Sequence, residues 1–153
     1  MLTIRRLSLA DAAILIHGTK IKANEIGVPM CISIVDESGN LIAFDRMDGG
    51  KTTSITISQD KAFTAAAARK ATHDYNEVCV PGNLAFGIHT ALGGRLCVVG
   101  GGLPIYDNEG TVVGGIGLSS GTPKQDMECA MAGIEYFQSH RKHPSLESCS
   151  SVQ

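Results

Sequence analysis

Apolar residues recur every three or four positions near the beginning of the chain, over residues 8–27. This spacing is typical of a helix that buries one face. Ser8 and Asp11 have the spacing of a capping box at its start, and Gly27 and Pro29 follow the last turn. The expected buried stripe consists of Ala12, Leu15, Ile16, Thr19, Ala23 and Ile26.

A second helical pattern occupies the end of the sequence. Thr122 and Gln125 have the spacing of another capping box, with Pro123 at the first helical position. The side chains expected to face inward are Met127, Ala130, Met131, Ile134 and Phe137. The polar stretch 142–153 that follows is predicted to be a flexible tail.

The segments between these helices contain short apolar runs typical of strands. Runs 30–35 and 41–47 flank a short polar loop with a glycine, which predicts an antiparallel hairpin. Runs 96–99, 103–106 and 112–118 predict three more strands, separated by turns rich in Gly or Asn. Alanine-rich residues 54–72 predict a helix that can lie close to a sheet, and residues 84–92 a short helix after the break at Pro81.

This order of elements predicts an α+β fold. We expect one domain over residues 1–141, an antiparallel five-stranded sheet that carries helices on its faces. A chain of 153 residues is long enough to bury a core of its own.

Composition narrows the possible partners. Thirteen Lys and Arg against fifteen Asp and Glu give a net charge of −2, which argues against nucleic acid or an anionic membrane as a partner. No apolar run reaches the roughly 18 residues of a membrane span. The five cysteines contain no C-x-x-C pattern, so we expect reduced thiols and a cytoplasmic protein.

Two motifs of nucleotide-binding proteins are incomplete. Gly50-Lys51-Thr52 resembles the end of a P-loop, but the required first glycine is replaced by Asp45. Gly115 and Gly117 lack the third glycine of a dinucleotide fingerprint. Neither motif therefore predicts a nucleotide site.

His17 lies off the main stripe of the first helix. At 100° per residue it falls on a second, weaker apolar stripe together with Ile14 and Ile21. An imidazole on such a stripe is compatible with a subunit contact, or with an axial ligand to a flat apolar cofactor. The residues alone leave both interpretations open.

Glycine clusters border the predicted strands, among them Gly100, Gly101 and Gly102. Successive glycines can present backbone N–H groups to a carboxylate or phosphate, but they also form tight turns and bulges. Nearby basic residues that could neutralise an acidic ligand are Arg46, Arg69, Lys70 and Arg95.

Short motifs in a fixed order over residues 2 to about 138 resemble the GlcG/HbpS family, which includes haem-binding proteins and the C-terminal domain of PduO-type corrinoid adenosyltransferases. The motifs are Val28-Pro29, Val35-Asp36-Glu37-Ser38-Gly39, Phe44-Asp45-Arg46-Met47-Asp48-Gly49, Lys61-Ala62-Phe63-Thr64-Ala65, Ala71-Thr72-His73, Pro81-Gly82, Gly100-Gly101-Gly102-Leu103-Pro104-Ile105, Gly114-Gly115-Ile116-Gly117-Leu118-Ser119, Gln125-Asp126 and Ala132-Gly133.

The resemblance implies a profilin-like sheet, assembly into dimers or larger rings, and non-covalent haem binding in several members. The PduO-type branch is expected to use a histidine of the first helix as an axial haem ligand, and His17 is the only histidine there. The adenosyltransferase domain has no counterpart in this chain, so the resemblance implies no ATP-dependent corrinoid chemistry.

Our leading hypothesis is a homo-oligomeric accessory protein that binds haem or a related tetrapyrrole and would serve corrinoid-dependent metabolism. His17 would be the axial ligand, and Ile14 and Ile21 would contact the macrocycle. Gly100, Gly101 and Gly102, or Arg95, would contact its propionates.

Two alternatives stay open. In one, the loop 100–105 holds a small anionic ligand, a carboxylate, and His73 or Lys61 transfers a proton as the catalytic group. In the other, the protein stabilises a larger assembly without a cofactor, and the second apolar stripe of the first helix is an interface.

Overall fold

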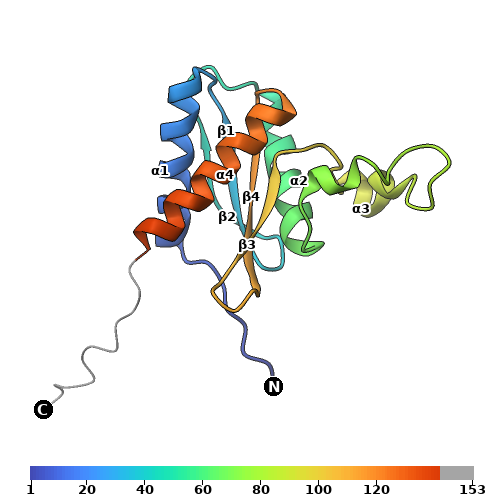
Figure 1. Ribbon diagram of the computed structural model, residues 1–153, viewed down its shortest axis with the longest axis horizontal. Helices are drawn as coiled ribbons and strands as arrows, with labels where there is room; N and C mark the ends of the chain where they lie inside the picture. The colour runs from blue at the N-terminus through green and yellow to red at the C-terminus, as the bar shows by residue number, and fades with distance from the viewer. Residues whose placement is uncertain (142–153) are drawn as a thin grey trace, which may run out of the picture.

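The computed structural model describes residues 1–141 and contains helices on both faces of one sheet (Figure 1). The predicted tail 142–153 lies outside the described residues. The helices are α1 (Leu9–Ile26), α2 (Thr53–Ala67), α3 (Ala91–Gly94) and α4 (Pro123–His140). The strands are β1 (Cys31–Asp36), β2 (Leu41–Arg46), β3 (Gly102–Tyr106) and β4 (Val112–Ser119). Two short 3-10 turns, η1 (Thr72–Tyr75) and η2 (Ile88–Thr90), precede α3.

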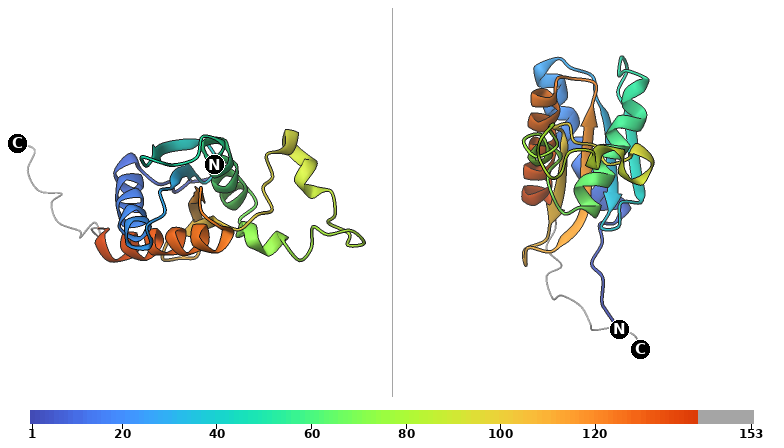
Figure 2. Two further views of the ribbon diagram at one scale, coloured as in Figure 1. Left: turned by 90° about the horizontal axis from the view of Figure 1, so that it is seen from above. Right: turned by 90° about the vertical axis from the view of Figure 1, so that its right-hand side faces the viewer.

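The sheet is antiparallel throughout, with the strand order β2-β1-β4-β3. Helices α1 and α4 pack together on one face, and α2 covers the other (Figure 2). The α+β class and the antiparallel sheet with helices on its faces are therefore confirmed, whereas the description as profilin-like stays a prediction.

The two faces of the sheet are packed in different ways. Under α1 and α4, Ile32, Ile34, Ile116 and Leu118 are fully buried and form the main core with apolar residues of both helices. Under α2 the contacting side chains are small: a Cβ on Gly117 would collide with the backbone of Ser58 and Ala62. Glycine in β4 and alanine in α2 thus let the helix backbone lie directly on the sheet.

Both predicted capping boxes are confirmed. Ser8 accepts a hydrogen bond from the N–H of Asp11, and Thr122 accepts one from Gln125. Gly27 ends α1 in the left-handed conformation, with φ of 70°. Within residues 1–141, no helix is long and apolar enough to cross a bilayer.

The predicted fifth strand, 96–99, is wrong: the sheet among the described residues has four strands. Cys97 donates its backbone N–H to the Thr64 hydroxyl (2.8 Å), and the carbonyl of Val98 accepts a hydrogen bond from the Asn76 amide (3.0 Å). These backbone groups are bonded to side chains, so they form no ladder with β3 or β4.

Two helix predictions also need correction. Helix α2 ends at Ala67, before the predicted residue 72, because Arg69 adopts the left-handed conformation (φ 55°). Residues 84–90 form turns and the 3-10 turn η2, and residues 91 and 92 begin the four-residue helix α3. Gly87 and Leu92 both have positive φ, so no continuous helix forms. The segment between α2 and β3 projects away from the sheet and its helices (Figures 1 and 2).

Candidate functional site on the outer face of the helix pair

His17 projects from the outer side of α1 and is exposed to solvent. The edge of its ring meets Tyr136 of α4, with ring centroids 5.4 Å apart. On the other side, the ring of His140 stacks on Tyr136 at 3.8 Å, with 10° between the planes. Three flat side chains from two helices thus form a row on one surface.

Close packing of α1 on α4 brings these rings together. A Cβ on Gly18 would collide with the side chain of Tyr136, and a Cβ on Gly133 would collide with Thr19. Glycine at both positions lets the two helices approach closely. The ion pair between Lys22 and Glu128 (3.2 Å) bridges the same two helices further along.

One exposed apolar side chain accompanies this row. Ile21, one turn along α1 from His17, is 48% exposed. Ile14 is only half-buried, but it packs against the main core. The second stripe predicted for α1 therefore carries one core residue, one exposed imidazole and one exposed isoleucine.

A hollow of about 580 Å³ begins one helical turn beyond His17, between α1 and β2. Lys20 and Asn24 of α1 line one side, while Arg46 and Met47 line the other. Lys20 forms an ion pair with Asp45 (2.8 Å). Arg46, which ends β2, is exposed and contributes a positive charge to the hollow, and Asp48, which also lines it, contributes a negative charge.

The structure does not bring Arg95 to this surface. Its guanidinium forms an ion pair with Asp60 of α2 (3.1 Å) and lies over the ring of Phe63 (3.9 Å). Helix α2 covers the opposite face of the sheet from α1 (Figure 2). Within one chain, His17 and Arg95 therefore cannot contact the same haem.

The cluster Gly100–Gly102 is also closely packed against the protein itself. Gly102 donates its N–H to the Thr72 hydroxyl (2.9 Å), and the carbonyl of Gly101 accepts the N–H of Leu118 (2.9 Å). Gly101 has φ of 124°, and a Cβ on it would lie 2.8 Å from the Cβ of Asp126. These observations favour a tight turn here over a binding loop for an anion.

Lys61 is 2% exposed, and its amine is bonded within the protein. It donates to the carboxylate of Asp126 (2.8 Å) and to the carbonyl of Leu118 (2.9 Å). Asp126 is itself 2% exposed and accepts the N–H of Gly121 (3.0 Å). Burial raises the pKa of the Asp126 carboxyl, and the bond from Lys61 opposes that rise.

This burial argues against Lys61 as a group that exchanges protons with a bound substrate, because a catalytic base needs contact with the reacting molecule. His73 lies at the start of the projecting segment, where its Nε2 is 3.4 Å from a carboxylate oxygen of Asp74. Its Nδ1 is buried without a hydrogen-bond partner among the described residues. The structure shows no bond between His73 and Lys61.

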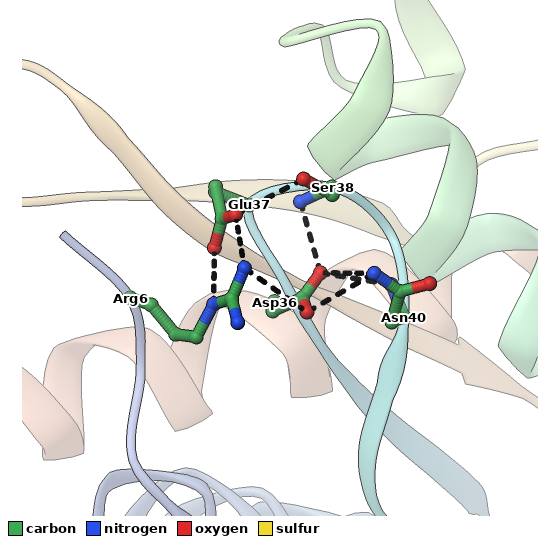
Figure 3. Close-up of polar contacts among 5 residues, drawn as sticks. All are labelled: Arg6, Asp36, Glu37, Ser38 and Asn40. Atoms are coloured by element: carbon green, nitrogen blue, oxygen red, sulfur yellow. Dashed lines mark hydrogen bonds and ion pairs between the residues drawn. The ribbon is translucent and has the colours of Figure 1, made fainter. Parts of the chain in front are cut away.

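The residues around Asp36 form a polar network that has a structural role (Figure 3). Asp36 accepts the backbone N–H groups of Ser38 and Asn40, both at 2.9 Å, and so closes the β1–β2 hairpin. Arg6 binds both oxygens of Glu37, at 2.8 and 2.6 Å. This pairing lowers the pKa of Glu37 to about 2 and anchors the segment before α1 to the hairpin.

Sequence reasoning missed three neighbours of the candidate residues: Tyr136 and His140 beside His17, and Asp126 beside Lys61. The i, i+4 spacing of Tyr136 and His140 indicates that these two share a helix face. No local signal places them beside His17, because α1 and α4 are separated by the whole sheet in the sequence.

Comparison with known proteins gives consistent relationships. A 15.0 kDa protein encoded in the dhaT-dhaS intergenic region of Citrobacter freundii is 37% identical over 134 residues, which cover 88% of this chain and 94% of that protein. The corrinoid adenosyltransferase PduO of Salmonella typhimurium is 34% identical over 128 residues, which cover 84% of this chain but only 38% of the enzyme.

A solved structure, the crystal structure of a PduOC:heme complex, shares the fold with a TM-score of 0.82. It is 33% identical in sequence, and the match covers 86% of this chain and 94% of that one. The family model described as haem degrading protein HbpS-like matches residues 7–135. Since this match spans most of the sequence, the resemblance to GlcG/HbpS proteins is confirmed, and the chain belongs to the HbpS-like family.

Proposed function

We propose that the protein binds haem, or a related tetrapyrrole, non-covalently on the outer face of α1, with His17 as an axial ligand. The observation that carries this proposal is the exposed His17 imidazole, which lies about one helical turn from the exposed Ile21 and from a polar hollow. A neutral imidazole is the common protein ligand of haem iron. The PduOC:heme complex, a relative of 33% identity, supports the choice of cofactor.

The residues around His17 fit a flat apolar group. Ile21 presents aliphatic surface one turn from His17, which the macrocycle would cover. Tyr136 contacts the His17 ring in a T-shaped arrangement and restricts the orientations of the imidazole on that side. The bound iron would supply redox or ligand-binding chemistry, whereas the chain supplies binding and orientation.

We assign the haem propionates to the hollow beside α1. Arg46 lines it and can form charge-assisted hydrogen bonds with a carboxylate. The earlier candidates for this role, Arg95 and the loop Gly100–Gly102, are bonded to α2 and to the core instead.

An accessory role in corrinoid-dependent metabolism is part of the proposal, and it is supported by the relationship to PduO. The activity of that enzyme does not extend to this chain, which matches only 38% of its length. A homo-oligomer is also proposed, because Leu84, Phe86 and Met131, which lie outside the surface assigned to haem, leave apolar surface uncovered in the single chain. The four cysteines among the described residues form no disulfide, which supports a cytoplasmic location.

Haemin titration followed by the Soret band tests the proposal. We expect the native protein to saturate with one haem per chain, and His17→Ala to weaken binding at least tenfold or to shift the band. His140→Ala removes a histidine from the same surface and is the matched control, with a near-native spectrum. Native affinity and an unchanged spectrum in His17→Ala would disprove the assignment.

A second pair of variants tests the placement of the propionates. Arg46→Gln is expected to weaken haem binding about tenfold or more, because a charge-assisted hydrogen bond contributes roughly 1.5–3 kcal/mol. Arg95→Gln, on the opposite face of the sheet, is expected to bind haem normally. The reverse result would place the propionates at α2.

A further inference from the structure

Cys79 and His89 lie in contact on the projecting segment between η1 and α3. The Cys79 sulfur is 3.2 Å from Nδ1 of the His89 ring. Cys79 is partly exposed and His89 is exposed, so solvent reaches the pair. Neither residue belongs to the surface assigned to haem.

Turns in the segment hold the two residues together although they are ten positions apart. Cys79 donates its backbone N–H to the carbonyl of Tyr75 (2.8 Å), which fixes the first side of the loop. Asn83 donates its side-chain amide to the carbonyl of Glu77 (2.8 Å), which folds the tip back. Gly82 and Gly87 provide the positive φ angles, 93° and 98°, that reverse the chain.

The other described cysteines have different surroundings. Cys31 and Cys129 are buried, and Cys97 is half-buried. Burial raises the pKa of all three thiols, that of Cys129 to about 11. Because the thiolate is the reactive form, these three are poor nucleophiles at neutral pH.

A metal ion does not account for the pair. Residues 1–141 contain no group of three or more His, Cys, Asp or Glu side chains that could hold one. A structural zinc site needs four ligands and a catalytic one three. A nucleophile at hydrogen-bond distance from a base is instead the arrangement that activates a thiol.

We propose that Cys79 and His89 form a thiol–imidazole pair through which the protein is reversibly modified by a low-molecular-weight disulfide. His89 Nδ1 accepts the thiol proton, and the Cys79 sulfur attacks one sulfur of the disulfide. The S–S bond of the reagent breaks as a mixed disulfide forms on Cys79. The displaced thiolate takes the proton from His89, so the Cys79 sulfur is oxidised and the leaving sulfur is reduced.

Glutathione disulfide and a chromogenic aromatic disulfide serve as probes, on the full-length protein with Cys149→Ser to remove the thiol of the tail. With the aromatic reagent, we expect a fast kinetic phase that releases one molecule of aromatic thiol per protein chain. Mass spectrometry should place the modification of this phase at Cys79. Glutathione disulfide should modify the same residue, and dithiothreitol should reverse it. Cys79→Ser should abolish the fast phase.

His89→Gln is the decisive variant. Without the base, the rate at neutral pH should fall roughly tenfold, and it should recover at alkaline pH where a thiol ionises unaided. His140→Gln, which removes a histidine from α4, is the matched control and should react at the native rate. Equal rates in the native protein and His89→Gln, or a fast phase at another cysteine, would overturn the proposal.

Discussion

Lys61 carries its amine into the interior, where Asp126 and the carbonyl of Leu118 are its partners. A buried charge loses its hydration, so it is tolerated only when its partners are close and well oriented. This pair connects α2 to α4. The bond from Lys61 to the carbonyl of Leu118 connects α2 to β4 as well. Its role is therefore to hold the two helix layers in place.

Lys61→Ala is expected to lower the free energy of unfolding by about 3–5 kcal/mol, because it leaves the Asp126 carboxylate buried and unpaired. Urea denaturation at neutral pH measures the change. Lys61→Met combined with Asp126→Leu removes both charges and should recover much of the loss. Lys22→Ala, which breaks only exposed ion pairs, should have little effect. A near-native midpoint for Lys61→Ala would contradict the structural role of the pair.

At the scale of elements, the segment before α1 is attached to the β1–β2 hairpin by Arg6 and Glu37 (Figure 3). Leu7 attaches the same segment to β4 by donating its N–H to the carbonyl of Val113 (3.1 Å). The motif of Asp36 to Gly39 that contributes to the family resemblance thus shapes a turn and holds a neighbouring segment. Its polar residues are bonded to each other and to the backbone.

The pairing with Arg6 predicts a loss of stability in acid. The pKa of Glu37 is about 2 in the folded protein, against an ordinary value of 4.5 for this side chain. The unfolded chain therefore binds more protons between these two values, and the contribution of Glu37 is complete above pH 5 and decreases toward pH 2.

Arg6→Gln should show a smaller decrease of the urea midpoint over this range than the native protein, and high salt should reduce the difference because the pair is partly exposed. Lys70→Gln, which removes a cation that lies over the Tyr75 ring, should retain the native pH dependence. A decrease of native size in Arg6→Gln would show that Glu37 is not stabilised by this pair.

At the scale of the whole molecule, the sheet with its two helix layers contrasts with the segment that projects from it (Figure 1). Its backbone bonds around residues 76–91 are short-range turns, and Leu84 and Phe86 are exposed. Such a segment opens at low free-energy cost compared with a core strand.

Limited digestion with chymotrypsin is expected to cut first after Leu84 or Phe86. Because β3, β4 and α4 follow the cut and pack with the preceding elements, both fragments should remain associated on gel filtration and separate only in denaturant. Mass spectrometry of the fragments identifies the site. First cleavage within α1 or β1 would contradict this distribution of stability, and protection of the segment at high protein concentration would reveal an interface there.

The sequence by itself determined the elements whose signals are local. The capping boxes of Ser8 and Thr122, the stop at Gly27 and the hairpin loop depend on residues a few positions apart, and all four were predicted correctly. The tertiary structure decided the features that depend on partners far away in the sequence, such as the pairing of residues 96–99. Residues 96–99 have strand composition, but Thr64 and Asn76 bind their backbone and no ladder forms.

The distinction between local signals and distant contacts applies to the candidate site as well. His17 could be singled out from its helix, whereas its contact with Tyr136 depends on how closely α1 and α4 pack. Lys61 was recognisable as a possible catalytic group, but only the fold showed that Asp126 neutralises it inside the core. A pattern along the chain specifies which face a residue occupies, and long-range packing specifies which groups it meets there.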